Sequence, residues 1–143
     1  MMRVERLIPN RLSRLLTVFA VLLLAGCAVN PAAQEQKVLD RAQARWDAVI
    51  AGDLESAYAY YSPGYRSATS VIDFAVEIRT RRVGYTSAKY VSHECGEARC
   101  TIKFLVGFRV PAPIPGMTVF DSTQLIEDTW VRTDGKWWYL PNN

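Results

Sequence analysis

The sequence predicts an α+β domain in which three helices precede an antiparallel sheet of about four strands. Apolar residues recur at helical spacing between Glu35 and Arg82, and from Gly84 onward they alternate with polar residues at a period of two. All helical segments precede all strand segments, an order typical of α+β folds rather than of parallel α/β folds. No internal repeat or linker interrupts residues 35–143, which are long enough for one domain with its own core.

Each predicted helix has a recognisable boundary. The first begins at Glu35 and ends at Gly52, a residue suited to the position after a last helical turn. Asp53 caps a short second helix, which ends at residues 62–64. The third begins at Ser70, where the S-x-x-D pattern resembles a capping box. The apolar stripe of the first helix consists of Leu39, Ala42, Trp46, Val49 and Ile50.

The predicted strands cover residues 90–95, 100–110, 118–132 and 137–140. The second strand has the clearest alternation, and its apolar members should face the core. Proline-rich residues 111–116 form the loop after it, and residues 133–136 form a tight turn. The apolar set of the second strand is Cys100, Ile102, Phe104, Val106, Phe108 and Val110.

Three carboxylates lie on the long third strand. Asp121 and Glu127 share one face, whereas Asp128 lies on the other face together with Trp130. Acidic residues on an antiparallel strand usually form its solvated face. The alternation does not reveal which of these two faces is inward.

The N-terminus consists of a basic leader, an apolar run and a cysteine. Four arginines precede the apolar run from Leu15 to Ala25, which is too short to span a bilayer comfortably and fits a secretory signal. The run ends in LAGC, Leu24 to Cys27, which resembles a lipobox. The resemblance implies cleavage after residue 26 and acylation of Cys27 with palmitate-type chains. The alternative, a buried helix, would need partners around an entirely apolar segment.

Removing residues 1–26 leaves 117 residues with 13 basic and 13 acidic side chains. The basic balance of the full chain therefore belongs to the signal, and it does not predict nucleic-acid binding. Residues 27–34 form a lipidated tether, so the domain should work near a membrane of the bacterial cell envelope, facing the periplasm. In the sorting pattern of the enterobacterial lipoproteins that this N-terminus resembles, Ala28 after the cysteine implies the outer membrane rather than the inner membrane.

The stretch HECGEARC brings the single histidine, His93, close to Cys95 and Cys100. In an oxidising periplasm the two cysteines should form a disulfide across a hairpin. A zinc site would need a further ligand, and a redox-active pair more often has the spacing C-x-x-C. Those alternatives, and free thiols, remain open at this stage, whereas His93 is expected to pack as a neutral side chain.

Two segments of the chain are informative together: ARWDAVIAGDLESAYAYYSPGYR, residues 44–66, and EDTWVRTDGKWWYLP, residues 127–141. The first resembles the first two helices of the small nuclear-transport-factor-2-like (cystatin-like) proteins, and the second resembles their closing hairpin. The resemblance implies a curved sheet wrapped around the helices, enclosing a conical pocket. It implies no particular activity, because this fold hosts enzymes, transport factors and accessory domains.

The expected function is binding by a non-enzymatic envelope lipoprotein. The ligand would be a small apolar molecule or a protein partner, and a plain accessory subunit or an oligomer is compatible with the same residues. The alternative is a pocket enzyme, isomerase-like or dehydratase-like, acting on a hydrophobic substrate. No cofactor motif or metal motif is present. The candidate pocket residues are Tyr58, Tyr61, Tyr65, Phe104, Asp128 and Trp130.

Overall fold

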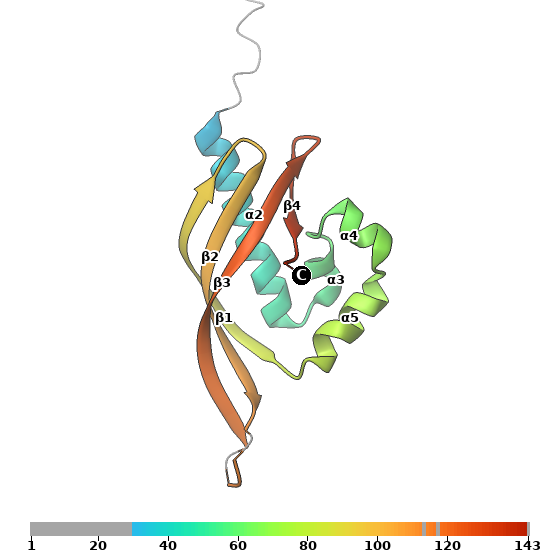
Figure 1. The fold of residues 1–143 in the computed structure, drawn as a ribbon, viewed down its shortest axis with the longest axis vertical. Coiled ribbons are helices and arrows are strands. Elements are labelled where there is room, and N and C mark those ends of the chain that lie inside the picture. Colours follow the sequence, from blue (N-terminus) through green and yellow to red (C-terminus); the bar gives the residue numbers. More distant parts are fainter. Residues whose placement is uncertain (1–29, 113, 117, 143) are drawn as a thin grey trace, which may run out of the picture. The chain divides into compact units, whose positions relative to one another are not determined.

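The computed structural model describes residues 30–112, 114–116 and 118–142. Residues 31–143 make up one compact unit, and Figure 1 shows its helices beside the sheet. The α+β class and the four antiparallel strands are confirmed. The elements are α2 (Pro31–Ala51), α3 (Leu54–Tyr58), α4 (Pro63–Ala68), α5 (Val71–Thr80), β1 (Gly84–Cys95), β2 (Arg99–Pro111), β3 (Val119–Thr133) and β4 (Lys136–Leu140).

Two helix boundaries differ from the sequence-based expectation. The helix α2 begins at Pro31 rather than at Glu35, because proline at the first helical position needs no hydrogen-bond partner. Residues 62–64, which were expected only to end the second helix, also begin a further helix, α4. The Ser62 side chain accepts a hydrogen bond from the backbone N–H of Tyr65, and Pro63 is the first helical residue. The expected three helices are therefore corrected to four in the described part of the chain.

The sheet is a simple meander with the order β1-β2-β3-β4. Its last connection is a tight hairpin in which Asp134 and Gly135 have φ angles of 52° and 74°. Positive φ at both central residues is the type I′ pattern that matches strand twist, so the predicted turn is confirmed. The strand β4 pairs only with residues 129–133 of β3.

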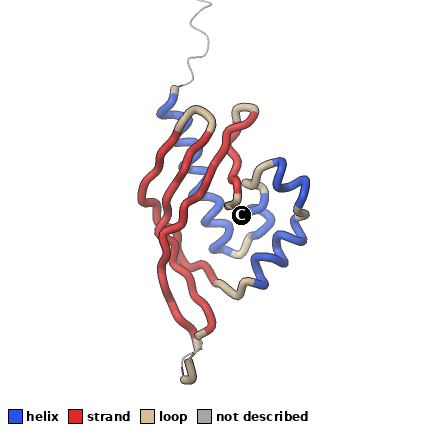
Figure 2. The backbone as a smooth tube through the Cα atoms, viewed as in Figure 1, coloured by secondary structure: helices blue, strands red, loops and turns tan. Residues whose placement is uncertain are grey.

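The ends of β2 and β3 nearest residues 111–119 project as a two-stranded ribbon. Figure 2 shows this ribbon extending away from the helices. The pairing of β1 with β2 stops at Gly84 and Arg109, so beyond that point β2 has a neighbouring strand only on its β3 side. Phe108, next to the end of the β1 pairing, and Val110, beyond it, are only half-buried, although alternation predicted that they would face the core.

The core lies between α2, the shorter helices and the inner face of the sheet. The inner side chains of β2, from Cys100 to Val106 at alternate positions, are buried as predicted. Asp128 and Trp130 lie on the inner face of β3, and Asp121 and Glu127 are exposed on the other face. No described helix is long and apolar enough to cross a membrane.

Candidate functional site

A buried ion pair lies at the centre of the domain. Asp128 is 0% exposed, and its Oδ2 atom lies 2.8 Å from the guanidinium of Arg45 on α2. The indole N–H of Trp46 donates to the same oxygen at 3.0 Å. The Arg45 guanidinium also stacks 3.9 Å from the centre of the Tyr139 ring. Side chains from α2 and β4 thus hold the Asp128 carboxylate of β3 in a fixed position.

Burial and charge act in opposite directions on Asp128. Burial raises the pKa of its carboxyl, and the neighbouring Arg45 lowers it without cancelling that effect. Burial lowers the pKa of Arg45, but Asp128 and the nearby tyrosines raise it more, so the guanidinium stays charged. Asp128 Oδ1 is buried and accepts no hydrogen bond of normal geometry, although the Trp130 indole lies close enough to lower the pKa of the carboxyl. The carboxylate is therefore only half satisfied.

The predicted tyrosines pack against one another. The Tyr58 hydroxyl donates to the backbone carbonyl of Thr69 at 2.6 Å and so secures the end of α4. The Tyr61 ring lies 4.7 Å from Tyr65 and 4.9 Å from Phe74 between ring centres. Burial raises the pKa of Tyr61, which keeps its hydroxyl protonated at neutral pH. These contacts give the tyrosines a packing role.

The six candidate pocket residues thus lie in or beside a filled interior. Phe104, Asp128 and Trp130 are all buried in the core. None of the six lines either of the two surface hollows described below. The sequence did not single out Arg45, but a signal was present. Arg45 lies three residues after Ala42 and four before Val49, which places it on the apolar stripe of its helix.

Cys95 and Cys100 form a disulfide, as predicted. They are directly opposite each other in the β1–β2 ladder, and His93 is opposite Ile102. His93 lies near the surface, with its Nδ1 atom 2.6 Å from the Tyr90 hydroxyl. Its Nε2 atom is 3.8 Å from a Glu35 carboxylate oxygen. Within the described residues, no three metal-ligating side chains form a cluster.

Replacing both cysteines with alanine should lower the free energy of unfolding by about 2 kcal/mol, because the short closed loop restricts the unfolded chain. Urea unfolding followed by tryptophan fluorescence would measure this difference. Mass spectrometry of the unreduced protein should also show the peptides joined with a deficit of two hydrogens. Two freely alkylated thiols in the native protein would contradict the pairing.

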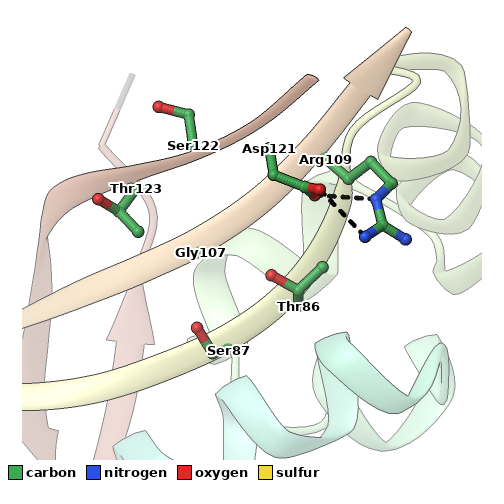
Figure 3. Close-up of a pocket in the computed structure, with 7 residues that line it drawn as sticks. All are labelled: Thr86, Ser87, Gly107, Arg109, Asp121, Ser122 and Thr123. Atoms are coloured by element: carbon green, nitrogen blue, oxygen red, sulfur yellow. Dashed lines mark hydrogen bonds and ion pairs between the residues drawn. The ribbon is translucent and has the colours of Figure 1, made fainter. Parts of the chain in front are cut away.

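A polar hollow of about 570 Å³ lies across three strands (Figure 3). It opens where Gly107 has no side chain, between Ser87 of β1 and Thr123 of β3. A Cβ atom at Gly107 would lie 2.5 Å from the Ser87 hydroxyl oxygen and 2.9 Å from that of Thr86, so a side chain there would force both hydroxyls to move. The exposed ion pair of Arg109 and Asp121 bounds the hollow.

A second hollow, of about 390 Å³, lies between α3 and α5. We call it the α3–α5 groove. Its lining combines aliphatic side chains with the charged residues Asp53, Glu55 and Arg79. Its most exposed apolar side chains are Ile72 and Val76, which are 71% and 55% exposed. The lining consists of Gly52, Asp53, Leu54, Glu55, Val71, Ile72, Ala75, Val76 and Arg79.

The fold is the nuclear-transport-factor-2-like fold. A member of that family from Streptomyces avermitilis superposes with a TM-score of 0.56 at 10% identity, over 77% of this chain and 93% of the other. SEC-C motif containing proteins from Rhodopseudomonas palustris (TM-score 0.51, 13% identity, 66% and 68% coverage) and Psychrobacter arcticus (0.52, 13%, 82% and 64%) are also similar. No family model and no curated protein matches the sequence. These likenesses define the fold alone.

Proposed function

We propose that this chain is a lipid-anchored protein of the bacterial cell envelope. Its folded domain binds an apolar segment of a protein partner and performs no catalysis. The observation that carries the binding role is the α3–α5 groove with its exposed aliphatic side chains. The anchor rests on the lipobox-like LAGC sequence, which lies outside the described residues.

The composition of the α3–α5 groove suits a protein segment. Ile72 and Val76 are four residues apart, so they form one continuous apolar strip along α5. Covering an aliphatic side chain fully contributes up to about 1.5–3 kcal/mol. Asp53, Glu55 and Arg79 line the same groove, and polar groups beside an apolar patch are typical of protein interfaces.

The packed interior supports a binding role over an enzymatic one. The buried carboxylate, Asp128, is held by Arg45 and Trp46. A general base must lie within hydrogen-bond reach of its substrate, directly or through one water molecule. One observation favours the alternative, a pocket enzyme for a hydrophobic substrate: Asp128 Oδ1 is buried and accepts no hydrogen bond of normal geometry. Using it would require the tryptophan and tyrosine rings around it to move.

The tether would keep the domain close to a bilayer. Since α2 begins at Pro31, only residues 28–30 separate it from Cys27. Four residue steps extend to at most about 14 Å. The partner proposed here is therefore an envelope protein that works next to the same membrane.

A photo-crosslinking amino acid at position 72 tests the α3–α5 groove in living bacteria. We expect an adduct with one partner, and we expect Val76→Asp in the same chain to abolish it, because a carboxylate in the apolar strip would lose its hydration. Val91→Asp is the matched control, since Val91 has similar exposure on β1. An adduct that survives Val76→Asp, or is lost equally in the control, would refute the groove as the binding site.

A further inference from the structure

The strand β3 has a long free edge between Val119 and Ile126. On one side β3 pairs with β2 throughout, but on the other side β4 takes up only residues 129–133. Asn142 donates to the backbone carbonyl of Glu127 at 3.1 Å, which closes the next position. No other described strand pairs with β3, so the eight residues from 119 to 126 form an open template for a further strand.

The direction of the free backbone groups can be assigned. The backbone N–H of Arg132 donates to the carbonyl oxygen of Ala98 at 2.8 Å. The backbone N–H and C=O groups of even-numbered residues of β3 therefore point toward β2. The β2–β3 register has no irregularity, so the alternation continues along the strand. Val119, Asp121, Thr123 and Leu125 therefore direct both their N–H and C=O groups toward the free edge.

The opposite edge of the sheet is protected, and this one is not. The ladder of β1 has two irregularities, between Tyr85 and Ser87 and between Tyr90 and Ser92. Bulges of this kind bend an edge and discourage further pairing. Residues 119–126 contain no proline, lysine or arginine, and their single charge, Asp121, is paired with Arg109. Val119, Phe120 and Leu125 are exposed along this unprotected edge.

We propose that a second copy of this chain pairs with this edge, antiparallel, about a two-fold axis through Thr123. In this register Phe120 lies opposite Ile126 of the second copy on the inner face, so an aromatic ring meets a β-branched side chain twice. Thr123 lies opposite itself with both backbone groups directed at the partner. The two sheets become one continuous sheet through residues 120–126 of each copy, and Val119 lies at the end of the pairing, opposite the position that Asn142 closes.

Charge and packing select this register over its neighbours. Centring the axis on Gln124 would place Asp121 opposite Glu127, and like charges directly opposite each other are unfavourable. Centring it on Ser122 would place Phe120 opposite Gln124 and lose the apolar pair. The sequence of β3 is thus self-complementary in one register, and this favours a second copy over an unrelated strand.

The pairing also constrains the chain on the membrane. Antiparallel strands point the two α2 N-termini in opposite directions along the shared sheet. If Cys27 carries the anchor proposed above, both tethers reach one bilayer only when the two-fold axis lies along the membrane normal. The shared sheet would then lie flat over the bilayer. The pairing itself does not depend on the partner-binding role of the α3–α5 groove.

The experiment introduces a cysteine at Thr123 in the full chain and oxidises native membranes. We expect a covalent homodimer at twice the subunit mass, whereas Ser92→Cys on the opposite edge strand should remain monomeric. In sedimentation of the purified full chain in detergent, Thr123→Lys should weaken the dimer about tenfold or more, because two lysines would meet at the axis. Ser92→Lys should not weaken it.

Three results would overturn the proposal. These are a monomeric wild-type chain with no crosslink at position 123, a crosslink to a different protein, or equal crosslinking at position 92. Circular dichroism and the unfolding midpoint of the Thr123→Lys variant should match the wild type, since residue 123 is exposed. An intact dimer without an adduct at position 72 would contradict only the partner-binding role of the α3–α5 groove. An adduct at position 72 without a dimer would contradict only the self-pairing of β3.

Discussion

Asp128→Asn should lower the free energy of unfolding by about 3–5 kcal/mol, because it leaves the buried Arg45 without a counter-charge. The loss is a large fraction of the stability of a domain of this size. Urea unfolding followed by tryptophan fluorescence would measure it. Asp121→Asn is the matched control, since it removes the partner of an exposed arginine and should shift the midpoint little.

The loss of stability caused by replacing Arg45 should depend on pH, whereas the loss caused by replacing Asp128 should not. Arg45→Met leaves Asp128 in an apolar site, where burial raises the pKa of the carboxyl further. A carboxyl with a raised folded-state pKa favours folding most below its unfolded pKa, near 4, and this contribution is lost as the pH rises through the folded value. The deficit of Arg45→Met should therefore be small near pH 4 and grow toward pH 8.

Arginine cannot release its proton in the same way, so the deficit of Asp128→Asn should stay nearly constant over that range. Arg45→Met combined with Asp128→Leu removes both charges and should recover most of the lost stability. Equal stability of Asp128→Asn and the wild type would show that the pair is not buried as described. A deficit of Arg45→Met that shrinks toward pH 8 would contradict the raised pKa of Asp128.

Cys27→Ser should abolish membrane anchoring through lipid. Serine cannot form the thioether, so the chain should accumulate as an uncleaved precursor without acyl labelling. Metabolic labelling with an alkyne fatty acid and the mass of the mature N-terminus would measure both effects. We expect complete loss of label, because single-site acylation has no alternative acceptor: Cys95 and Cys100 are joined to each other.

The control for that experiment is the Cys95→Ala and Cys100→Ala double variant, which should keep its acyl label. Detergent-soluble membrane association with full labelling in Cys27→Ser would refute the lipoprotein assignment. Residues near Cys27 lie outside the described part of the chain, so this prediction rests on LAGC and the apolar run before it.

Local signals were sufficient for the order of the elements, the strand ladder and the disulfide. The alternation in residues 100–110 and the turn at Asp134 and Gly135 depend on neighbours within a few positions, which the sequence displays directly. The helix α4 was missed because Ser62 and Pro63 are compatible with both the end of one helix and the start of another.

The sequence alone therefore determined the fold class and the pairing of Cys95 with Cys100, and it is the sole basis of the proposed anchor. Only the tertiary structure decided which face of β3 is inward, because a period of two marks two faces without distinguishing them. It also decided that Arg45 is buried. That burial depends on Asp128, 83 positions away, and on rings from other elements that surround the pair. The free edge of β3 likewise depends on how far β4 reaches along it, a property of the assembled sheet.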